Sequence, residues 1–463
     1  MPRTGPGESI FMNIIVIGAG ELGRLLASAL SEEDHDVVIV DSDADELARV
    51  SDKFDAMTIA GSCSSVSTLK QAGAETADAV LAVSGDEAAN ILACQIANKL
   101  GVKHTVCRLY SNDCFSADDG ISPATYGLWR TFSSPEESAE KILAVLTSPI
   151  TLESITFTNP DAAMLVLEIT RSSILQGVRI RDIPGPELLR KIRFAALVRD
   201  RQLLIPHGDT LLIPGDRVYV AGRKEDIGAF VDWATPENAG KPSRIIVSGD
   251  DDTSVIVARK ARELGFGVRM IVRDEKTGER IQDEIPPGIM VLHGDPTDES
   301  LLEDAGIAAA DVFVSAAQDD EENILSCIIA KRLGAKKVIS LTHRPEYIRI
   351  AREMGPIDCA FSATLVAANS VLRLLEGGNK RVDVQLQSFK AAISEFRIAG
   401  GSPLCGKAIS AAKLPASLVL ALVFRGGEIF APAGDTVLVE GDIVVAVVTR
   451  DTMRTIDKIF PAQ

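Results

Sequence analysis

The sequence is poor in the residues from which most metal and redox sites are built. Its 463 residues include only seven Cys and five His, and no CxxC motif occurs. Several Cys sit in apolar stretches such as ILACQIA and ILSCIIA. An odd number of scattered thiols favours neither zinc nor a disulfide framework, so we expect small buried hydrophobic residues in a reducing cytosol.

The chain also lacks an excess of positive charge and a long apolar run. Its 48 Lys and Arg against 65 Asp and Glu give a formal net charge of −17, which argues against a general nucleic-acid binder. Apolar runs such as SLVLALVF are strand-sized, well below the roughly 18 to 20 residues of a membrane span. We expect a soluble, cytoplasmic protein whose residues 1–12 are a disordered extension.

Two sequence patterns recur in the same order. IIVIG at 14–18 returns as IIVSG at 245–249, an offset of 231 (245 − 14). GDTLLIPGDRVYVAG from Gly208 returns as GDTVLVEGDIVVAVV from Gly434, an offset of 226 (434 − 208). The repeat is too long for a solenoid, and each half can hold two small domains. The predicted domain order is therefore A-B-A′-B′.

Strand-like and helix-like segments alternate through each A unit, which favours a parallel sheet covered by helices on both faces. Residues 111–134 are interpreted as a loop, followed by a helix that leaves the sheet for crossover or pairing. The B units read as small α+β domains. The fold class is α/β, with two Rossmann-like domains that each precede a small α+β domain in tandem duplication. The predicted domain bounds are 13–134, 135–234, 244–362 and 363–463, with a linker at 235–243.

The first half carries a dinucleotide-binding fingerprint. G-x-G-x-x-G follows an apolar strand and opens a helix, and Asp41 ends the next strand 18 residues after the last glycine. We expect the helix N-terminus to bind a pyrophosphate and Asp41 to accept hydrogen bonds from ribose hydroxyls. A carboxylate there repels a 2′-phosphate, so NAD(H) or an adenine nucleotide is favoured over NADP. The six fingerprint residues are Gly18, Ala19, Gly20, Glu21, Leu22 and Gly23.

The second half breaks this pattern. Residues from Ser248 to Thr253 occupy the same place and include three consecutive Asp, whose charge opposes a pyrophosphate. The position that matches Asp41 falls near Arg273. Three readings stay open for this half: no ligand, a different nucleotide held through Arg273, or a cation held by Asp250 to Asp252. An acidic turn in solvent is the commonest meaning of such a run.

Catalytic partners for a bound nucleotide are missing. A dehydrogenase needs acid/base and substrate-orienting groups in its second domain. The B units carry one His, His207, in a turn, and the chain has no G-x-S-x-G and no GK[ST]. We therefore predict that the protein is not an enzyme and that the nucleotide acts as a signal.

The residues resemble a known family. The segments NIIVIGAGELG, VVIVD, AGS and AVSGDEAAN resemble the N-terminal domain of the regulator-of-potassium-conductance (RCK, or KTN) family. The B units resemble its C-terminal domain, and the tandem order is that of the family's peripheral subunits for potassium uptake. The resemblance implies a cytoplasmic regulatory subunit on the inner membrane face, bound to a TrkH-type potassium-transporting protein. It also implies a ring, here a homotetramer, whose first site binds NAD(H) or ATP/ADP in competition.

Carried over by position, the resemblance adds four residues to the predicted cofactor site. Ser62 follows the third strand, Ser84 and Gly85 line the cleft after the fourth, and Arg108 ends the fifth as a phosphate or inter-subunit contact. Where the family often has Gly-Asp, the first half has Gly-Ser at Ser62. Two alternatives remain: a regulatory ring of another cation channel or antiporter, and an NAD-dependent oxidoreductase.

Overall fold

The protein is described from a computed structural model. It describes residues 12–460, except for 33–34, 52–55, 112–113, 117–118, 147–150, 170–172, 185, 201, 235–242, 355–356, 376–379, 387–390, 413, 416, 450–451, 453–455 and 457–458. The predicted extension before Met12 and the predicted linker up to residue 242 lie outside the described residues. The chain forms two compact units, each built from both sequence halves: residues 10–143 with 242–375, and residues 144–241 with 376–463.

The first Rossmann domain is a parallel sheet in the order β3-β2-β1-β4-β5-β6. Its strands are β1 (Asn13–Ile17), β2 (Asp36–Asp41), β3 (Met57–Ala60), β4 (Ala79–Ala82), β5 (His104–Leu109) and β6 (Arg130–Ser133). Its helices are α1 (Glu21–Glu32), α2 (Ala44–Ser51), α3 (Val66–Gln71) and α4 (Glu87–Leu100), with the 3-10 turn η1 (Pro123–Tyr126). The central strands β1 and β4 are buried on both faces, as the apolar runs predict.

The prediction of a continuous loop over 111–134 is wrong at its end. Residues Arg130–Ser133 form β6, which pairs in parallel with β5. The strand has only four residues, and three of them, Arg130, Thr131 and Ser133, are polar, so it shows no clear periodicity. β6 forms because it pairs with β5, and a contact of this kind cannot be read from the four residues themselves.

The second Rossmann domain repeats this plan in the order β14-β13-β12-β15-β16-β17. Its strands are β12 (Arg244–Ser248), β13 (Gly267–Val272), β14 (Met290–His293), β15 (Val312–Ser315), β16 (Lys337–Thr342) and β17 (Cys359–Ser362). Its helices are α8 (Asp252–Glu263), α9 (Glu275–Glu284), α10 (Glu299–Asp304), α11 (Asp320–Arg332) and α12 (Glu346–Met354), with η4 (Ile307–Ala309).

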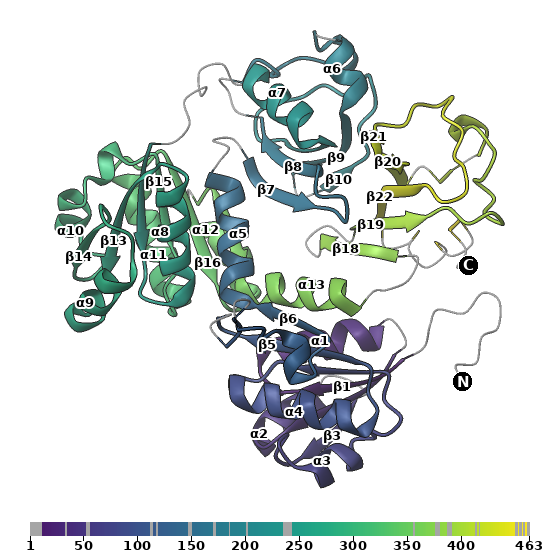
Figure 1. The fold of residues 1–463 in the computed structure, drawn as a ribbon. Helices are drawn as coiled ribbons and strands as arrows, with labels where there is room; N and C mark the ends of the chain where they lie inside the picture. The colour runs from purple at the N-terminus through teal and green to yellow at the C-terminus, as the bar shows by residue number, and fades with distance from the viewer. Residues whose placement is uncertain are drawn as a thin grey trace. The chain divides into compact units, whose positions relative to one another are not determined.

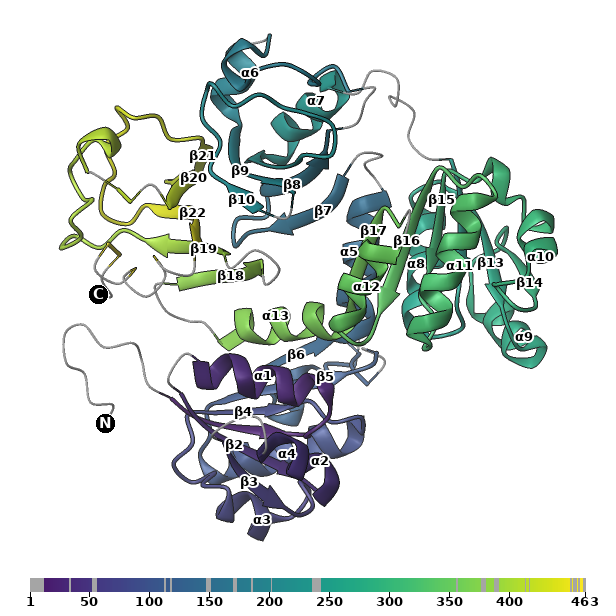
Figure 2. The same cartoon turned by 180° about the vertical axis from the view of Figure 1, so that it is seen from behind.

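The helices that follow the two sheets, α5 (Ser134–Leu146) and α13 (Ala363–Leu375), join the two Rossmann domains. Ala367, Ala368 and Val371 of α13 are buried in the core of the first domain, against Leu26 and Leu30 of α1. Both views of the ribbon show α13 beside α1 (Figures 1 and 2). The second half therefore supplies part of the first half's core, which pairs the duplicated domains within one chain.

Hydrogen bonds and ion pairs add to this pairing. The Ser370 hydroxyl on α13 donates to the Glu137 carboxylate on α5 at 2.7 Å, and Arg373 contacts the same carboxylate at 3.4 Å. Lys260 on α8 lies 3.8 Å from Glu140 on α5. The helix predicted to cross over or to pair therefore pairs with its own duplicate.

The C-terminal domains form the second compact unit. The first has the antiparallel order β10-β9-β11-β8-β7 and the second the order β18-β19-β22-β20-β21. The first comprises β7 (Thr151–Thr156), β8 (Ala162–Glu168), η2 (Ile180–Asp182), α6 (Pro186–Lys191), β9 (Arg193–Arg199), β10 (Gln202–Leu204), β11 (Arg217–Arg223) and α7 (Lys224–Ala234). The second comprises β18 (Lys380–Leu386), β19 (Ala391–Arg397), η6 (Ile409–Ala411), β20 (Leu418–Arg425), β21 (Glu428–Phe430) and β22 (Ile443–Thr449).

Each C-terminal domain contains a G-D-x-V motif, GDRV at 215–218 and GDIV at 441–444, whose Asp makes a buried ion pair. Asp216, which is 1% exposed, accepts two hydrogen bonds of 2.7 Å from the guanidinium of Arg199. In the second domain Asp442 does the same for Arg425 at 2.8 and 2.6 Å. Bidentate pairs of this kind fix geometry as well as charge.

The two antiparallel sheets also share one apolar core. In the described part of the chain no helix is both long and apolar enough to cross a membrane.

Candidate functional site

The predicted site residues of the first half meet at one edge of the sheet. The fingerprint turn follows β1, Asp41 ends β2 and Ser84 follows β4, and all these strands are parallel. In the order β3-β2-β1-β4-β5-β6 the direction of strand addition reverses between β1 and β4. Ligands of open α/β sheets bind outside the carboxyl ends of the strands at such a point.

The three fingerprint glycines serve different purposes. Gly18 has φ +103°, and a Cβ there would lie 2.9 Å from the Ser84 backbone. A Cβ on Gly23 would lie 1.8 Å from the Gly18 carbonyl oxygen, so the turn and the helix pack too closely for any side chain. A Cβ on Gly20 would meet nothing within 4 Å. Gly20 therefore leaves open space in front of α1, where its first amides face outward.

The remaining fingerprint residues divide between core and surface. Ala19 and Leu22 are buried, so their side chains do not reach a ligand. The Glu21 side chain is partly exposed and pairs with Arg24 at 3.1 Å. Arg24 also donates to the Ala19 carbonyl at 3.2 Å and contacts Glu46 of α2. Arg24 therefore joins the fingerprint turn to α2. The motif does not include this arginine, and the sequence analysis missed it, although it directly follows Gly23.

The Asp41 carboxylate lies against the fingerprint turn. Its Oδ2 accepts a hydrogen bond from the Ala19 amide at 2.6 Å, and its Oδ1 accepts one from the Asp43 amide at 2.9 Å. The Asp41 carbonyl also accepts from the Gly61 amide at 2.8 Å, which brings the exposed Ser62 beside it. The Ser62 hydroxyl accepts from the Ser64 amide at 3.2 Å. Asp41 and Ser62 therefore form the β2–β3 side of the site.

The other side of the site is formed by the segments after β4 and along β5. Gly85 is exposed, and its carbonyl accepts from the Tyr110 hydroxyl at 3.3 Å. The Arg108 guanidinium lies 5.2 Å from the centre of the Tyr110 ring. Among the described residues, the buried Arg108 Nε has no hydrogen-bond partner. A buried donor left unsatisfied is costly, so the hydrogen bonding of this arginine is incomplete within the described residues.

A cysteine, Cys63, directly follows Ser62 on the β2–β3 side of the candidate site. Cys63 is half-buried, and burial raises the pKa of its thiol, an effect that the neighbouring Asp86 and Asp41 carboxylates reinforce. This environment therefore favours the neutral thiol over the thiolate.

The second-half turn aligns with the first at Gly249, one residue later than the sequence analysis placed it. The Gly249 amide donates to the Ile271 carbonyl, as the Gly18 amide donates to that of Val40. Asp251 therefore stands in the place of Gly20. It caps α8, accepting from the Ser254 amide at 2.9 Å and its hydroxyl at 2.7 Å. Burial raises the pKa of Asp251, although the Ser254 amide and hydroxyl oppose the shift.

The ribose carboxylate is also replaced. The Gly294 amide donates to the Val272 carbonyl, as the Gly61 amide donates to that of Asp41, so Val272 holds the position of Asp41. Arg273 follows it and makes ion pairs with Asp295, at 3.2 Å, and with Glu322. A buried valine and an arginine bound by two carboxylates leave no ribose acceptor at this position.

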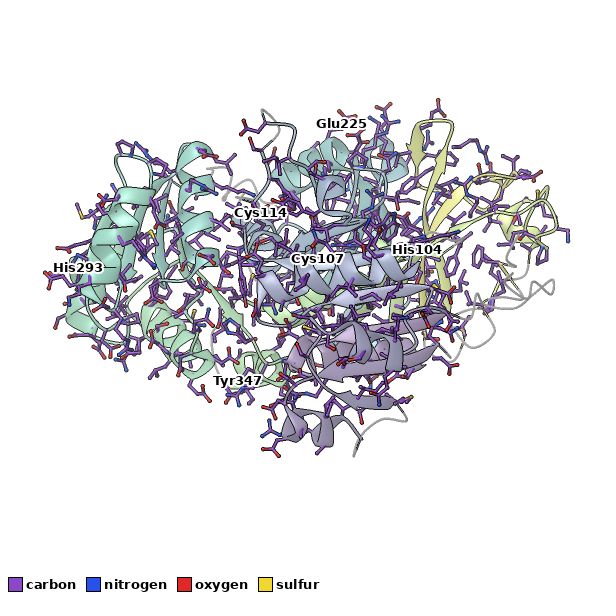
Figure 3. The ribbon with its side chains drawn as sticks, turned by 60° about the horizontal axis from the view of Figure 1, so that its bottom comes forward. His104, Cys107, Cys114, Glu225, His293 and Tyr347 are labelled. Atoms are coloured by element: carbon purple, nitrogen blue, oxygen red, sulfur yellow. The ribbon has the colours of Figure 1, made fainter. Side chains whose placement is uncertain are left out.

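A metal centre is not formed by the described residues. No group of three His, Cys, Asp or Glu among them is placed to hold an ion, the Asp250 to Asp252 run included. Figure 3 shows that the labelled His104 and Cys107 come from β5, whereas His293 comes from β14 and Tyr347 from α12.

Comparison with known proteins agrees with the four-domain plan. The model of the TrkA-N domain matches residues 14–114 and 245–363, and that of the TrkA-C domain matches residues 164–235 and 393–460. The Trk system potassium uptake protein TrkA homolog 1 of Methanosarcina mazei is 30% identical over 97% of this chain and 100% of its own. The Trk system potassium uptake protein TrkA of Halomonas elongata is 29% identical over 97% and 98%.

Solved structures resemble the fold along nearly the whole chain. The crystal structure of the GsuK RCK domain has a TM-score of 0.63 at 17% identity, covering 99% of this chain and 98% of that one. The GsuK channel bound to NAD has a TM-score of 0.61 at 17% identity, covering 99% and 81%. With both domain models matched twice and full-length relatives at this identity, the chain belongs to the TrkA family of tandem RCK proteins.

Proposed function

We propose that this chain is a nucleotide-sensing regulatory subunit of a potassium transporter, and that residues 13–134 form its sensing domain. The observation that carries the proposal is the open space at Gly20 beside the Asp41 carboxylate. A helix N-terminus without a side-chain cap attracts a phosphate, and a carboxylate at the end of β2 suits ribose hydroxyls. The names of the curated relatives, which are Trk system potassium uptake proteins, supply the transported ion.

The ligands that this site suits are NAD(H) and the adenine nucleotides ATP and ADP. Both ligand types share the adenosine and its phosphates, so they would compete for Asp41 and the fingerprint amides. Structures of GsuK bound to NAD and to ADP, with TM-scores of 0.61 and 0.50 to this chain, support binding of both ligand types. Asp41 disfavours the 2′-phosphate of NADP because two negative charges would meet there.

The proposed partner is a TrkH-type potassium-transporting membrane protein, which the chain binds as a peripheral subunit on the cytoplasmic face. The proposed assembly is a homotetramer in which eight Rossmann domains form a ring. The pairing of α5 with α13 inside one chain supports this arrangement, since each chain then contributes two joined segments. Closed symmetry is the common outcome for identical chains.

We propose a signalling role and no catalytic one. The described side chains at the first site are a carboxylate, hydroxyls, an arginine, a tyrosine and a thiol with a raised pKa. An oxidoreductase would also need a second domain that brings substrate and a proton donor to the nicotinamide. Turnover of NADH with a small-molecule acceptor would favour that alternative, and binding to another cation channel or antiporter would favour a ring with a different partner.

The test measures nucleotide affinity with and without the partner. NADH and ADP are titrated by calorimetry into the purified chain and into its complex with the TrkH-type protein in nanodiscs. If the nucleotide regulates transport, the partner must change nucleotide affinity, because linkage is reciprocal. Potassium flux in proteoliposomes should then depend on nucleotide and lose that dependence in Asp41→Ala. Equal affinities together with nucleotide-independent flux would refute the proposal.

A further inference from the structure

A buried asparagine organises the side of the first site opposite Asp41. Asn90 lies in the first turn of α4 and is completely buried. Its Oδ1 accepts hydrogen bonds from the Ser84 amide at 3.1 Å and the Ser84 hydroxyl at 2.7 Å. Its Nδ2 donates to the Ser84 carbonyl at 3.1 Å and to the Arg108 carbonyl at 3.2 Å. The amide thereby uses all four of its hydrogen bonds.

These bonds fix two groups that the site depends on. The Ser84 backbone is the surface that a Cβ on Gly18 would strike at 2.9 Å, so the position of Ser84 sets the wall of the fingerprint turn. The Arg108 carbonyl is held by the same amide, and the Arg108 side chain carries a buried Nε without a partner among the described residues. One side chain therefore joins the end of β4 to β5 and orients both residues.

The location of this network indicates which part of a ligand it would serve. A dinucleotide spans the crevice on both sides of the switch point, with its two halves over different strands. Asp41 stands on the β2 side, where ribose recognition is expected, whereas Ser84 and Arg108 stand on the β4–β5 side. NADH continues beyond its second phosphate, while ADP ends there. Groups on the β4–β5 side can therefore contact NADH where ADP has no atoms.

The second half repeats the hydrogen bonds of Asn90 through Asn323, but on residues with apolar side chains. Asn323 is also completely buried, and it bonds the Ala317 amide at 2.8 Å, the Ala317 carbonyl at 2.7 Å and the Leu341 carbonyl at 2.9 Å. Its Oδ1 also accepts from the Ser315 hydroxyl at 2.9 Å. Ala317 and Leu341 stand where the first half has Ser84 and Arg108. The amide makes equivalent bonds to the backbone in both halves, but the two residues that it holds carry polar side chains, Ser84 and Arg108, only in the first half.

We propose that Asn90 is the positioning residue that lets the first site distinguish a dinucleotide from a mononucleotide, through Ser84 and Arg108. This inference rests on the proposed nucleotide binding at that site. Without the amide, the segment after β4 loses its tie to β5, and the contacts beyond the second phosphate are lost. The adenosine half, held from the β2 side, is retained.

The experiment compares full-length Asn90→Ser with its matched control Asn323→Ser. Calorimetry with NADH and with ADP gives both affinities, and thermal unfolding gives the stability of each variant. We expect Asn90→Ser to weaken NADH about tenfold or more and ADP less than about threefold, a ratio that the loss of one or two hydrogen bonds produces. Asn323→Ser should lower the melting temperature to a similar extent and leave both affinities unchanged.

Equal losses of NADH and ADP affinity in Asn90→Ser, or no loss of either, would overturn the inference. If Asn90→Ser does not fold, Ser84→Ala takes its place, because the second half shows that alanine is tolerated there. An unchanged ratio of NADH to ADP affinity in Ser84→Ala would then count against the inference in the same way. Absence of nucleotide binding to the unaltered chain is a different result, which would refute the proposed function itself.

Discussion

In the first Rossmann domain the space before the leading helix holds no side chain, whereas in the second it holds the Asp251 carboxylate. The backbone plan is the same, since Gly18 and Gly249 make equivalent hydrogen bonds to the neighbouring strand. What differs is the partner of the helix N-terminus. The N-terminus of α8 is capped by the Asp251 side chain, while the residue at the same place before α1 is Gly20, which has no side chain to cap the helix. The two halves share a fold and differ at this turn, which is why we propose different roles for them.

The C-terminal domains show the opposite outcome. Arg199 with Asp216 and Arg425 with Asp442 make the same bidentate pair at an offset of 226 (442 − 216), and both carboxylates are buried. A pair that holds the domain together is kept in both halves. The glycines and the carboxylate that we propose for nucleotide binding occur together in the first half only. The first three predictions below test this contrast and a fourth concerns acid stability, and they run from the largest expected effect to the smallest.

Asp216→Ala and Asp442→Ala should destabilise the chain by similar amounts, about 3 kcal/mol each, because each removes a buried carboxylate that accepts hydrogen bonds from a partly exposed guanidinium and from a backbone amide. Denaturant unfolding monitored by circular dichroism measures the loss. Nucleotide affinity of the folded fraction should not change. A large cost in one domain and none in the other would break the equivalence of the two pairs.

Gly20→Asp copies Asp251 into the first half and should abolish nucleotide binding, with a penalty of about 3 kcal/mol from the carboxylate facing a pyrophosphate. Stability should hold or rise slightly, because Asp caps a helix better than Gly by a few tenths of a kcal/mol. The control is Asp251→Gly, which should lose its cap and gain no nucleotide binding. Calorimetry with NADH gives the comparison, and undiminished binding in Gly20→Asp would contradict it.

Asp41→Asn should weaken both NADH and ADP by about 1 to 3 kcal/mol, the cost of losing a charged hydrogen-bond acceptor. Asparagine can still accept from the Ala19 amide, so the turn should keep its shape. The preference against NADPH should shrink as well, because the repelling charge is gone. Val272→Asp in the second half is the matched control and should not create a site. Selective loss of only one ligand would argue against a shared adenosine position.

The smallest effect concerns acid stability. Burial raises the pKa of Asp311, but the Lys336 ammonium and the Ser243 and Arg244 amides outweigh it and hold the pKa at about 2, below its ordinary 3.8. A depressed folded pKa means that this stabilisation is complete above pH 4 to 5 and is lost as the pH falls toward about 2. Asp311→Asn should therefore flatten the stability profile over that window by about 1 kcal/mol, since the group is partly solvated. Identical acid profiles for both proteins would exclude this contribution.

The sequence by itself determined the architecture and identified the candidate site of the first half. The offsets of the repeats and the alternation of apolar strands with helices predicted two Rossmann-like domains and two small α+β domains. Gly18, Gly20, Gly23 and Asp41 were identified because their spacing reflects local geometry, a turn, a helix start and a strand end. Such features are encoded within about 25 residues of chain, so a pattern can show them.

Only the tertiary structure decided the rest. β6 forms because it pairs with the edge of β5. α13 packs into the core of the first domain against Leu26 and Leu30, which precede it by about 340 residues in the chain. The hydrogen bond that Asn90 donates to the Arg108 carbonyl joins residues 18 positions apart in the chain. At the turn of the second half the structure places Asp251 opposite Gly20, whereas the match of Ser248 to Thr253 with the six fingerprint residues was displaced by one residue. Each of these is a contact between segments distant in sequence, and no local pattern of residue types records which partner a side chain will meet.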